Sequence, residues 1–404
     1  MSEPTPSRLA LPSMLASFRE VPLRVLAATL AAQTFATMAL FSVPTAAPEI
    51  ARDLHVPGSL IGVFVSLVYG IGIVSALLSP GFVHRYGAVR VTQVSLIAVI
   101  GMLLTAAAGS LAALGLAAVV LGLAYGAIAP ASTHLLVPQT PRPVFNLVMS
   151  LRQIGVPLGG VLGALFVPPM VGLAGWRVTL LVELAPVLAL LLLLELPRRA
   201  WDHDRDRLWP LWGRVLLQPF RLLAEDHRLR GLSVASFVFS GVQLCFIAFM
   251  TVQLTSVVRV DLVRAGFALA LYQIAGAASR PVWGWVADRY LSPSRMLAVL
   301  GFAMAVAALA MGRFGPGWPW AAVLGVAVFG GLTASGFTGI AYAEYARLGG
   351  TRRTEATGLG TAAMFAGVML MPSLFGAAVT AWGGWFLPYV VLAALAAGSA
   401  LLLV

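Results

Sequence analysis

The sequence predicts an all-α membrane protein with twelve transmembrane helices in two pseudo-symmetric six-helix bundles. Three observations predict it: the chain is very apolar, its apolar residues fall in runs of membrane-spanning length, and one long polar connector divides the runs into two sets of six. The 404 residues are 60% hydrophobic and 10% charged, with a mean hydropathy of +0.92. A soluble domain carries about 25% charged residues, so this chain has too few to coat a water-facing surface.

Each apolar run has the length of one membrane crossing, since about 20 helical residues span a hydrocarbon layer of about 30 Å. Backbone groups inside lipid must be paired within their own segment, so these runs form helices. The predicted spans are residues 22–44, 59–80, 91–110, 112–137, 144–168, 176–196, 232–256, 265–287, 294–313, 319–345, 355–380 and 385–404.

The polar connector sets the domain organisation. Its first part alternates aspartate with arginine, and Leu208 to Arg230 then mixes tryptophan and leucine with arginine. That second pattern favours a helix lying at the membrane interface, with a solvated linker as the alternative. The predicted regions are a cytoplasmic tail (1–21), an N-terminal six-helix bundle (22–196), a cytoplasmic linker (197–231) and a C-terminal six-helix bundle (232–404).

The arginines predict the topology. All 26 basic residues are arginine and the net charge is +11. With the N-terminus inside, 21 arginines lie at or near cytoplasmic ends and five near the outer face. The positive-inside rule therefore selects a multi-pass topology with both termini in the cytoplasm, and we expect the protein in a bacterial inner membrane. Because the arginines do not follow one face, we expect no nucleic-acid partner.

The two halves repeat one another at an offset of 204 residues. Gly72 corresponds to Gly276, and the run His84 to Tyr86 corresponds to the run Asp288 to Tyr290. Both runs fall in a short cytoplasmic loop, after the second and the eighth span. An internal duplication of this kind is typical of two-domain transporters that rock about a central site.

At these loops the chain resembles the major facilitator superfamily. The loop signature of that family, G-x-x-x-D-R-x-G followed by basic residues, is well kept in the run Gly284 to Leu291. In the first half Pro80 replaces the glycine and His84 the aspartate. The resemblance implies two bundles around a central cleft. It implies gating roles for the residues that match the signature, which are Gly284, Asp288 and Arg289 in one loop and Arg85 and Gly87 in the other.

The predicted gate has a simple physical basis. A carboxylate at the end of one helix can bond the N-terminus of a neighbouring helix and nearby arginines, which holds the inner gate shut. Asp288 can do this, whereas His84 lacks a permanent negative charge, so we expect a weaker or differently built contact in the first half. The alternative is that Asp288 and Arg289 only anchor a loop at the lipid headgroups.

Three charged residues lie well inside predicted spans, where a charge costs about 2.5–3.5 kcal/mol even on the most lenient scale. Arg152 in span five and Arg280 in span eight could flank a bound anion; a snorkelling position or a gate pair with Glu344 is the alternative. Glu183 in span six is a candidate for proton coupling, with a structural pair to Arg177 or to another helix as the alternative.

Uncharged polar residues in the helices that would line a central cleft complete the predicted substrate site. Each of them could instead form a hydrogen bond between helices. They are Gln33, Tyr69, Tyr125, Gln153, Gln243, Tyr272, Gln273 and Thr338.

The predicted function is secondary active transport of a small organic solute, with a lean towards an organic anion or carboxylate. Transport would proceed by alternating access with proton coupling or exchange. The alternatives are proton-coupled multidrug efflux and a membrane ligand sensor without a transport cycle. The five histidines show no metal-ligand spacing and no catalytic motif is present, so we expect no enzyme activity, no cofactor and no metal. The expected partners are the solute, a proton as the candidate coupling ion, and the bilayer around a monomer.

Overall fold

The computed structural model describes residues 22–55, 60–211 and 218–404, and these form helices joined by short connections. The predicted tail, residues 1–21, lies outside the described residues. The helices are α2 (Leu23–Thr45), α3 (Ala47–Leu54), α4 (Leu60–Tyr86), α5 (Ala88–Ala107), α6 (Leu111–Leu136), α7 (Phe145–Gln153), α8 (Gly155–Val182), α9 (Leu184–Leu193), α10 (Arg198–Trp201), α11 (Gln218–Glu225), α12 (His227–Gln253), α13 (Leu262–Arg289), α14 (Pro293–Gly312), α15 (Trp320–Ala334), α16 (Thr338–Gly349), α17 (Arg353–Ala381) and α18 (Phe386–Leu401).

The described helices account for twelve membrane crossings. Eight segments are long and apolar enough to span a membrane, and two of them are 52 and 62 residues long. One crossing needs about 20 residues, so each of these two crosses twice. The first turns back at Gly175 and the second at Gly350, whose φ angles of +80° and +55° suit glycine. The more polar α13 and the shorter α18 complete the predicted set.

The two halves pack their helices in the same pattern. In the first half α2 packs on α8 and α4 on α6, and in the second half α12 packs on α17 and α13 on α15. Glycine allows these close approaches: an added Cβ at Gly159 would lie 2.3 Å from the Thr34 carbonyl oxygen, and one at Gly367 would lie 1.9 Å from that of Phe237. The glycine residues of α8 and α17 therefore allow close packing of these helices against α2 and α12.

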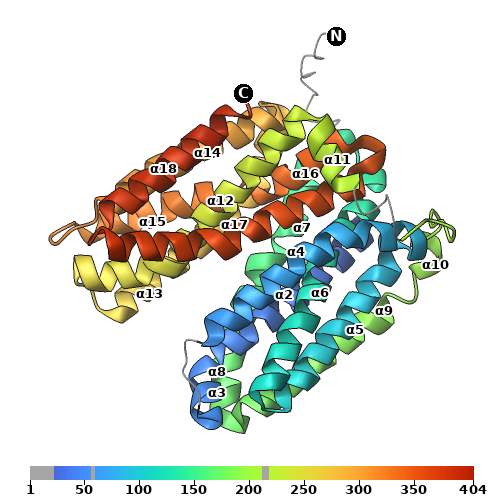
Figure 1. Cartoon of the computed structure of the whole chain (residues 1–404), viewed down its shortest axis with the longest axis horizontal. Coiled ribbons are helices and arrows are strands. Elements are labelled where there is room, and N and C mark those ends of the chain that lie inside the picture. Colours follow the sequence, from blue (N-terminus) through green and yellow to red (C-terminus); the bar gives the residue numbers. More distant parts are fainter. Residues whose placement is uncertain (1–21, 56–59, 212–217) are drawn as a thin grey trace.

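The halves meet mainly at one end of the molecule. We call it the linker end, because the linker helices α10 and α11 lie there beside the end of α4 and the beginning of α17 (Figure 1). There α4 packs against α17, and α13 packs against α7. From this region the two bundles diverge, one towards α3 and the other towards the beginning of α13 (Figure 1). The structure therefore shows a conformation in which the linker end is closed.

The linker differs from the predicted interfacial helix. Residues 205–211 are not helical, 212–217 lie outside the described residues, and only the short α11 follows. The side chain of Asp206 accepts a hydrogen bond from the Leu208 backbone N–H (2.9 Å) and forms a turn there. Asp226 then caps α12, accepting from the Arg228 N–H at 2.7 Å. The predicted helix over Leu208 to Arg230 is therefore wrong as one element, because residues 208–211 follow the Asp206 turn without helix and Asp226 starts a new helix inside the stretch.

Candidate functional site

The candidate site forms at two helix breaks. Pro157 has no backbone N–H, so the carbonyl oxygen of Gln153, four residues earlier, loses its helical partner. The helix divides there into α7 and α8. A second break at residues 335–337 separates α15 from α16, and the Ser335 carbonyl lies in it. Each break leaves main-chain oxygen atoms that need a donor.

Arg280 on α13 supplies donors to both breaks. Its Nη1 donates to the Gln153 carbonyl in the other half, and its Nε donates to the Ser335 carbonyl at 3.1 Å. The side chain is 3% exposed. Arg280 therefore bridges the halves through main-chain oxygens. Its predicted alternative pairing with Glu344 is wrong, because Glu344 accepts instead from Arg347 at 2.5 Å.

Arg152, the other predicted cation, lies on α7 and is completely buried. None of its guanidinium nitrogens hydrogen-bonds a described residue. Its Cζ lies 5.1 Å from the centre of the Tyr342 ring, a cation–π contact that contributes about 2 kcal/mol when desolvated. Burying an unpaired ion costs several kcal/mol, so this contact does not offset the cost. The Arg152 guanidinium needs an anionic partner.

Aromatic residues from both halves pack together at the same level of the interface. Tyr125 stacks on Phe365 with ring centres 5.5 Å apart, and Tyr69 meets Phe365 edge-on at 5.1 Å. The Tyr125 hydroxyl lies 3.3 Å from the Thr37 hydroxyl, which also accepts from Gln33 at 3.2 Å. The predicted residues of spans one, two and four are thus joined in one cluster that Phe365 closes from the second half.

The remaining predicted polar residues are placed differently. Gln243 donates to the Ser335 side chain at 3.1 Å, a contact within the second half. Tyr272 is completely buried. Thr338 is also buried, and its hydroxyl has no hydrogen-bond partner among the described residues. Gln273 is partly exposed on α13. Of these, the Tyr272 and Thr338 hydroxyls are both buried without a hydrogen-bond partner among the described residues.

Glu183 lies where α8 passes into α9, three residues before Pro186, which lacks the N–H of a regular helix. Its carboxylate accepts a hydrogen bond from the Ser42 hydroxyl on α2 at 2.6 Å. The predicted pair with Arg177 is wrong, since Arg177 binds Asp53 at 2.7 Å. The contact with another helix is confirmed, and it lies within the first half.

Asp288 joins the halves at the end of α13. Its carboxylate accepts from the backbone N–H groups of Asn146 and Leu147, both at 2.9 Å, and from the Asn146 side chain at 2.8 Å. A carboxylate is favourable at the beginning of a helix, here α7. Gly284, one turn earlier, permits the approach: an added Cβ would lie 2.7 Å from the Ser150 hydroxyl. This is the geometry that the sequence predicts for a gate contact.

Replacing Asp288 by Asn should weaken the closed linker end. Asn keeps one carbonyl acceptor for three donors and loses the charge, and a hydrogen bond to a charged group contributes about 1.5–3 kcal/mol. We expect the balance between closed and open to shift by roughly tenfold or more. The measurement is the alkylation rate of a single cysteine placed at Ser150 in a Cys245→Ser background.

Two controls accompany that measurement. Asp261→Asn changes an aspartate on the same helix at its opposite end, where it caps α13, and should leave the alkylation rate unchanged. An unchanged rate in Asp288→Asn itself would show that Asp288 only anchors its loop.

In the first half, the corresponding contact between the two bundles has its acidic residue and its small residue on the other helix. His84 occupies the position of the aspartate, and its Nε2 lies 3.2 Å from a carboxylate oxygen of Glu355 in the first turn of α17. Pro80 occupies the position of the glycine, and the small residue is Gly358 on α17, where an added Cβ would lie 2.3 Å from the Ala76 carbonyl. Both the acid and the small residue therefore stand on the partner helix.

A second histidine connects this contact to the linker. His134 lies 2.8 Å from the Thr354 hydroxyl and 2.9 Å from the Asp204 carboxylate, while Trp209 stacks on His84 at 4.5 Å. The hydrogen bond from His134 lowers the pKa of Asp204. Because this pKa is lower in the folded than in the unfolded chain, the contact stabilises the fold above the ordinary carboxyl range and loses that contribution as the pH falls through the lowered value.

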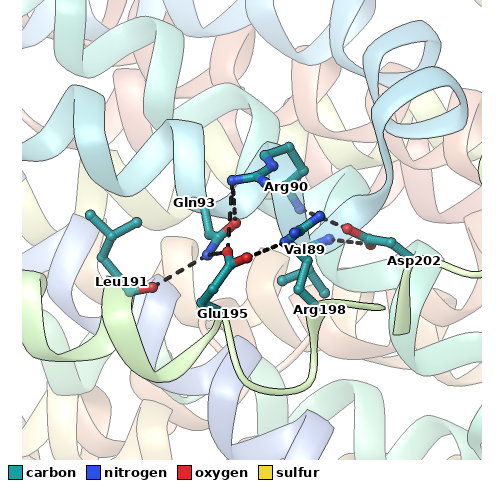
Figure 2. Close-up of polar contacts among 7 residues, drawn as sticks. All are labelled: Val89, Arg90, Gln93, Leu191, Glu195, Arg198 and Asp202. Carbon is teal, nitrogen blue, oxygen red and sulfur yellow. Dashed lines mark hydrogen bonds and ion pairs between the residues drawn. The ribbon is translucent and has the colours of Figure 1, made fainter. Parts of the chain in front are cut away.

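The beginning of the linker is anchored on the first half (Figure 2). Asp202 accepts from the backbone N–H groups of Val89 and Arg90, at 2.8 and 3.1 Å, and so caps α5. Glu195 accepts from Gln93 at 3.0 Å on the same helix. Burial raises the pKa of Asp202, against the effect of the two backbone hydrogen bonds. This part of the connector is therefore folded against α5 and is not a solvated linker.

The predicted gate residues Gly87 and Arg85 both contact the beginning of the linker. Gly87 has a φ of +97°, and an added Cβ would lie 2.2 Å from the Asp202 carboxyl carbon, so only glycine fits. Arg85 donates to the Trp209 carbonyl at 3.4 Å. Arg289, the equivalent in the second half, lies over the Tyr290 ring at 5.9 Å. Signature residues of the first loop thus contact the linker.

The sequence contained a signal for the residues that were missed. Glu355 and Gly358 belong to the run Glu355-Ala356-Thr357-Gly358, which places an acid and a glycine three residues apart at the start of a span. That run combines an acidic residue with a glycine, as the loop signature does, but it lies on the partner helix α17. The contacts of His134 join residues more than 60 positions apart, and no local spacing predicts them.

Comparisons with known proteins agree with this geometry. The chain is 26% identical over 299 residues to the 4-hydroxybenzoate transporter PcaK of Pseudomonas aeruginosa, covering 66% of each protein, and 23% identical over 299 residues to that of Acinetobacter baylyi, covering 66% of this chain and 65% of the relative. It thus spans just under two thirds of the length of these relatives.

Solved structures share the fold across nearly the whole chain. The Escherichia coli fucose:proton symporter FucP superposes with a TM-score of 0.72 at 13% identity, covering 94% of this chain and 97% of FucP. The human organic anion transporter MFSD10 gives 0.73 at 14% identity, covering 94% and 99%.

Fold and site together define a multi-pass membrane protein of two related bundles that meet around buried charge, the architecture of transporters. The sequence model of the Major Facilitator Superfamily matches residues 29–345 and 234–404. The chain belongs to this superfamily.

Proposed function

We propose that this protein is a secondary active transporter of a small organic anion, with aromatic carboxylates as the first candidates. Arg152 carries the proposal, because its buried guanidinium has no hydrogen-bond partner among the described residues. A carboxylate would supply the missing acceptors in bidentate geometry. The cluster of Tyr69, Tyr125 and Phe365 near this level offers ring faces and edges to an aromatic substrate.

The similarity to transporters of 4-hydroxybenzoate supports the same class of substrate, and the shared fold with proton symporters supports coupling to a proton gradient. The arginine distribution supports a linker end that faces the cytoplasm of a bacterial inner membrane. In that orientation the structure corresponds to the outward-facing or occluded part of an alternating-access cycle.

The test is uptake of labelled 4-hydroxybenzoate into proteoliposomes, with and without an imposed pH gradient. We expect saturable uptake that the gradient stimulates. Unlabelled benzoate should compete, whereas benzamide should not, because it has the same shape but lacks the charge that Arg152 requires. Equal competition by benzamide, or export of a lipophilic cation in place of benzoate uptake, would count against an anion transporter and favour efflux of drugs.

Glu183 permits a separate prediction about coupling. Glu183→Gln should keep gradient-driven uptake within about twofold of the parent, because the Gln carbonyl still accepts the hydrogen bond from Ser42. The measurement compares gradient-driven uptake with substrate exchange at equal pH. Loss of the first with the second retained would reassign Glu183 to proton coupling, and Ser42→Ala serves as the matched control for the hydrogen bond.

A further inference from the structure

The beginning of the linker carries a strongly basic pocket that transport does not require. It has a volume of about 690 Å³ and lies beside the anchor shown in Figure 2. Its lining consists of Arg198, Arg199, Asp202, His203, Arg205 and Arg207.

Most of the positive charge in this pocket is free. Arg198 is paired with Glu195 at 2.7 Å, and the Asp202 carboxylate is occupied by the backbone of α5. Arg199, Arg205 and Arg207 are exposed, and none has an ion pair or hydrogen bond to a described residue. Three guanidinium groups line one pocket, which the Asp202 hydrogen bonds attach to α5. Such groups bind phosphate oxygens in bidentate geometry.

Exposed apolar residues next to the pocket arginines in sequence favour a lipid over a soluble anion. Leu196 and Leu208, close to its arginines in sequence, are 83% and 89% exposed. Trp201 and Trp209 are partly buried beside them, and tryptophan is enriched at the headgroup level of membranes. The last apolar span of the first half ends with α9 at Leu193, so the pocket, which begins five residues later, is expected at the depth of the headgroups. Acyl chains and glycerol would cover the leucines that a free phosphate leaves in water.

We propose that this pocket binds the phosphate group of an anionic phospholipid from the leaflet at the linker end. Basic pockets of this kind on the cytoplasmic side bind acidic headgroups. The same segment carries Asp204 and Trp209, which contact His134 and His84 at the gate. A bound lipid therefore orders residues 198–209 and favours the closed linker end. The proposal does not depend on which solute is transported.

The test is native mass spectrometry of the purified full chain titrated with phosphatidylglycerol or phosphatidylcholine. The parent should prefer phosphatidylglycerol by roughly tenfold or more, since each arginine near a membrane surface contributes about 1 kcal/mol. The triple variant R199Q/R205Q/R207Q should lose this preference. The control R221Q/R228Q/R230Q removes the same charge from exposed arginines at the same end, outside the pocket, and should keep it.

Equal loss in both triple variants would show diffuse surface charge and overturn the proposal. So would a parent that shows no lipid preference but is stabilised by inorganic phosphate, which would assign the pocket to a soluble anion. If the pocket variant does not fold, hydrogen exchange of the parent decides. Amides of residues 198–209 should exchange more slowly in nanodiscs with phosphatidylglycerol than in nanodiscs with phosphatidylcholine alone, and equal rates would contradict a lipid site.

Discussion

Arg152→Ala should abolish anion uptake while leaving the protein as stable as the parent, or more so. Truncating one partner of a buried charge pair costs about 2–5 kcal/mol, so substrate binding should fall on the order of a hundredfold. The unliganded protein should gain stability, because the substitution removes from its interior an ion that has no hydrogen-bond partner among the described residues. The measurements are labelled 4-hydroxybenzoate uptake and the thermal midpoint in detergent.

Arg280→Ala is the matched control, because Arg280 is also a buried cation at the same interface. Its donors already bind the Gln153 and Ser335 carbonyls, so its loss should lower the thermal midpoint. Arg152→Lys keeps the charge without the planar fork and should retain partial uptake. If Arg152→Ala transports like the parent, or if it is destabilised as Arg280→Ala is, the anion site is not at Arg152.

Gly358→Val should prevent the linker end from closing. Any Cβ at this position would lie 2.3 Å from the Ala76 carbonyl oxygen in the other half, so the two bundles must separate before it fits. Overpacking of this kind costs about 1–3 kcal/mol, which shifts the equilibrium towards the open linker end by roughly tenfold or more. We expect faster alkylation of a cysteine at Ser150 from the linker side, with transport lost.

Two glycines provide controls for this prediction. Gly266 has no atom within 4 Å of an added Cβ, so Gly266→Ala should change neither accessibility nor stability. Gly367 meets the Phe237 carbonyl within its own half, so Gly367→Ala should lower the thermal midpoint without opening the linker end specifically. Unchanged alkylation in Gly358→Val would mean that the contact between α4 and α17 does not control closure.

The sequence predicted the gate of the second half more completely than that of the first. In the second half Gly284, Asp288 and the start of α7 act together, and the signature that predicts them is local to one loop. In the first half the acid and the small residue stand on α17, more than 270 positions from His84. A local motif cannot indicate an exchange between two helices that are distant in sequence, so the loop looked degraded although a contact exists.

The structure also distinguished the two predicted buried arginines, which the sequence could not. From the sequence, Arg152 and Arg280 have equal depth and equal chemistry, and both were candidates for an anion site. The structure gives Arg280 two main-chain acceptors, of which the Gln153 carbonyl is released by Pro157. Among the described residues, Arg152 has no hydrogen-bond partner and contacts the face of Tyr342. The difference arises from helix breaks in both halves, which meet only when the bundles are assembled.

The sequence by itself determined the twelve crossings, their division into two sets of six and the family, because these follow from hydrophobic length, one polar connector and a local loop signature. It also determined that charge would be buried at the interface. Only the tertiary structure decided which of those charges has a partner, where Glu183 and Asp202 bind, and that the linker contacts the predicted gate residues. Burial and pairing depend on contacts between residues far apart in the chain, and these exist only once the two bundles have packed together.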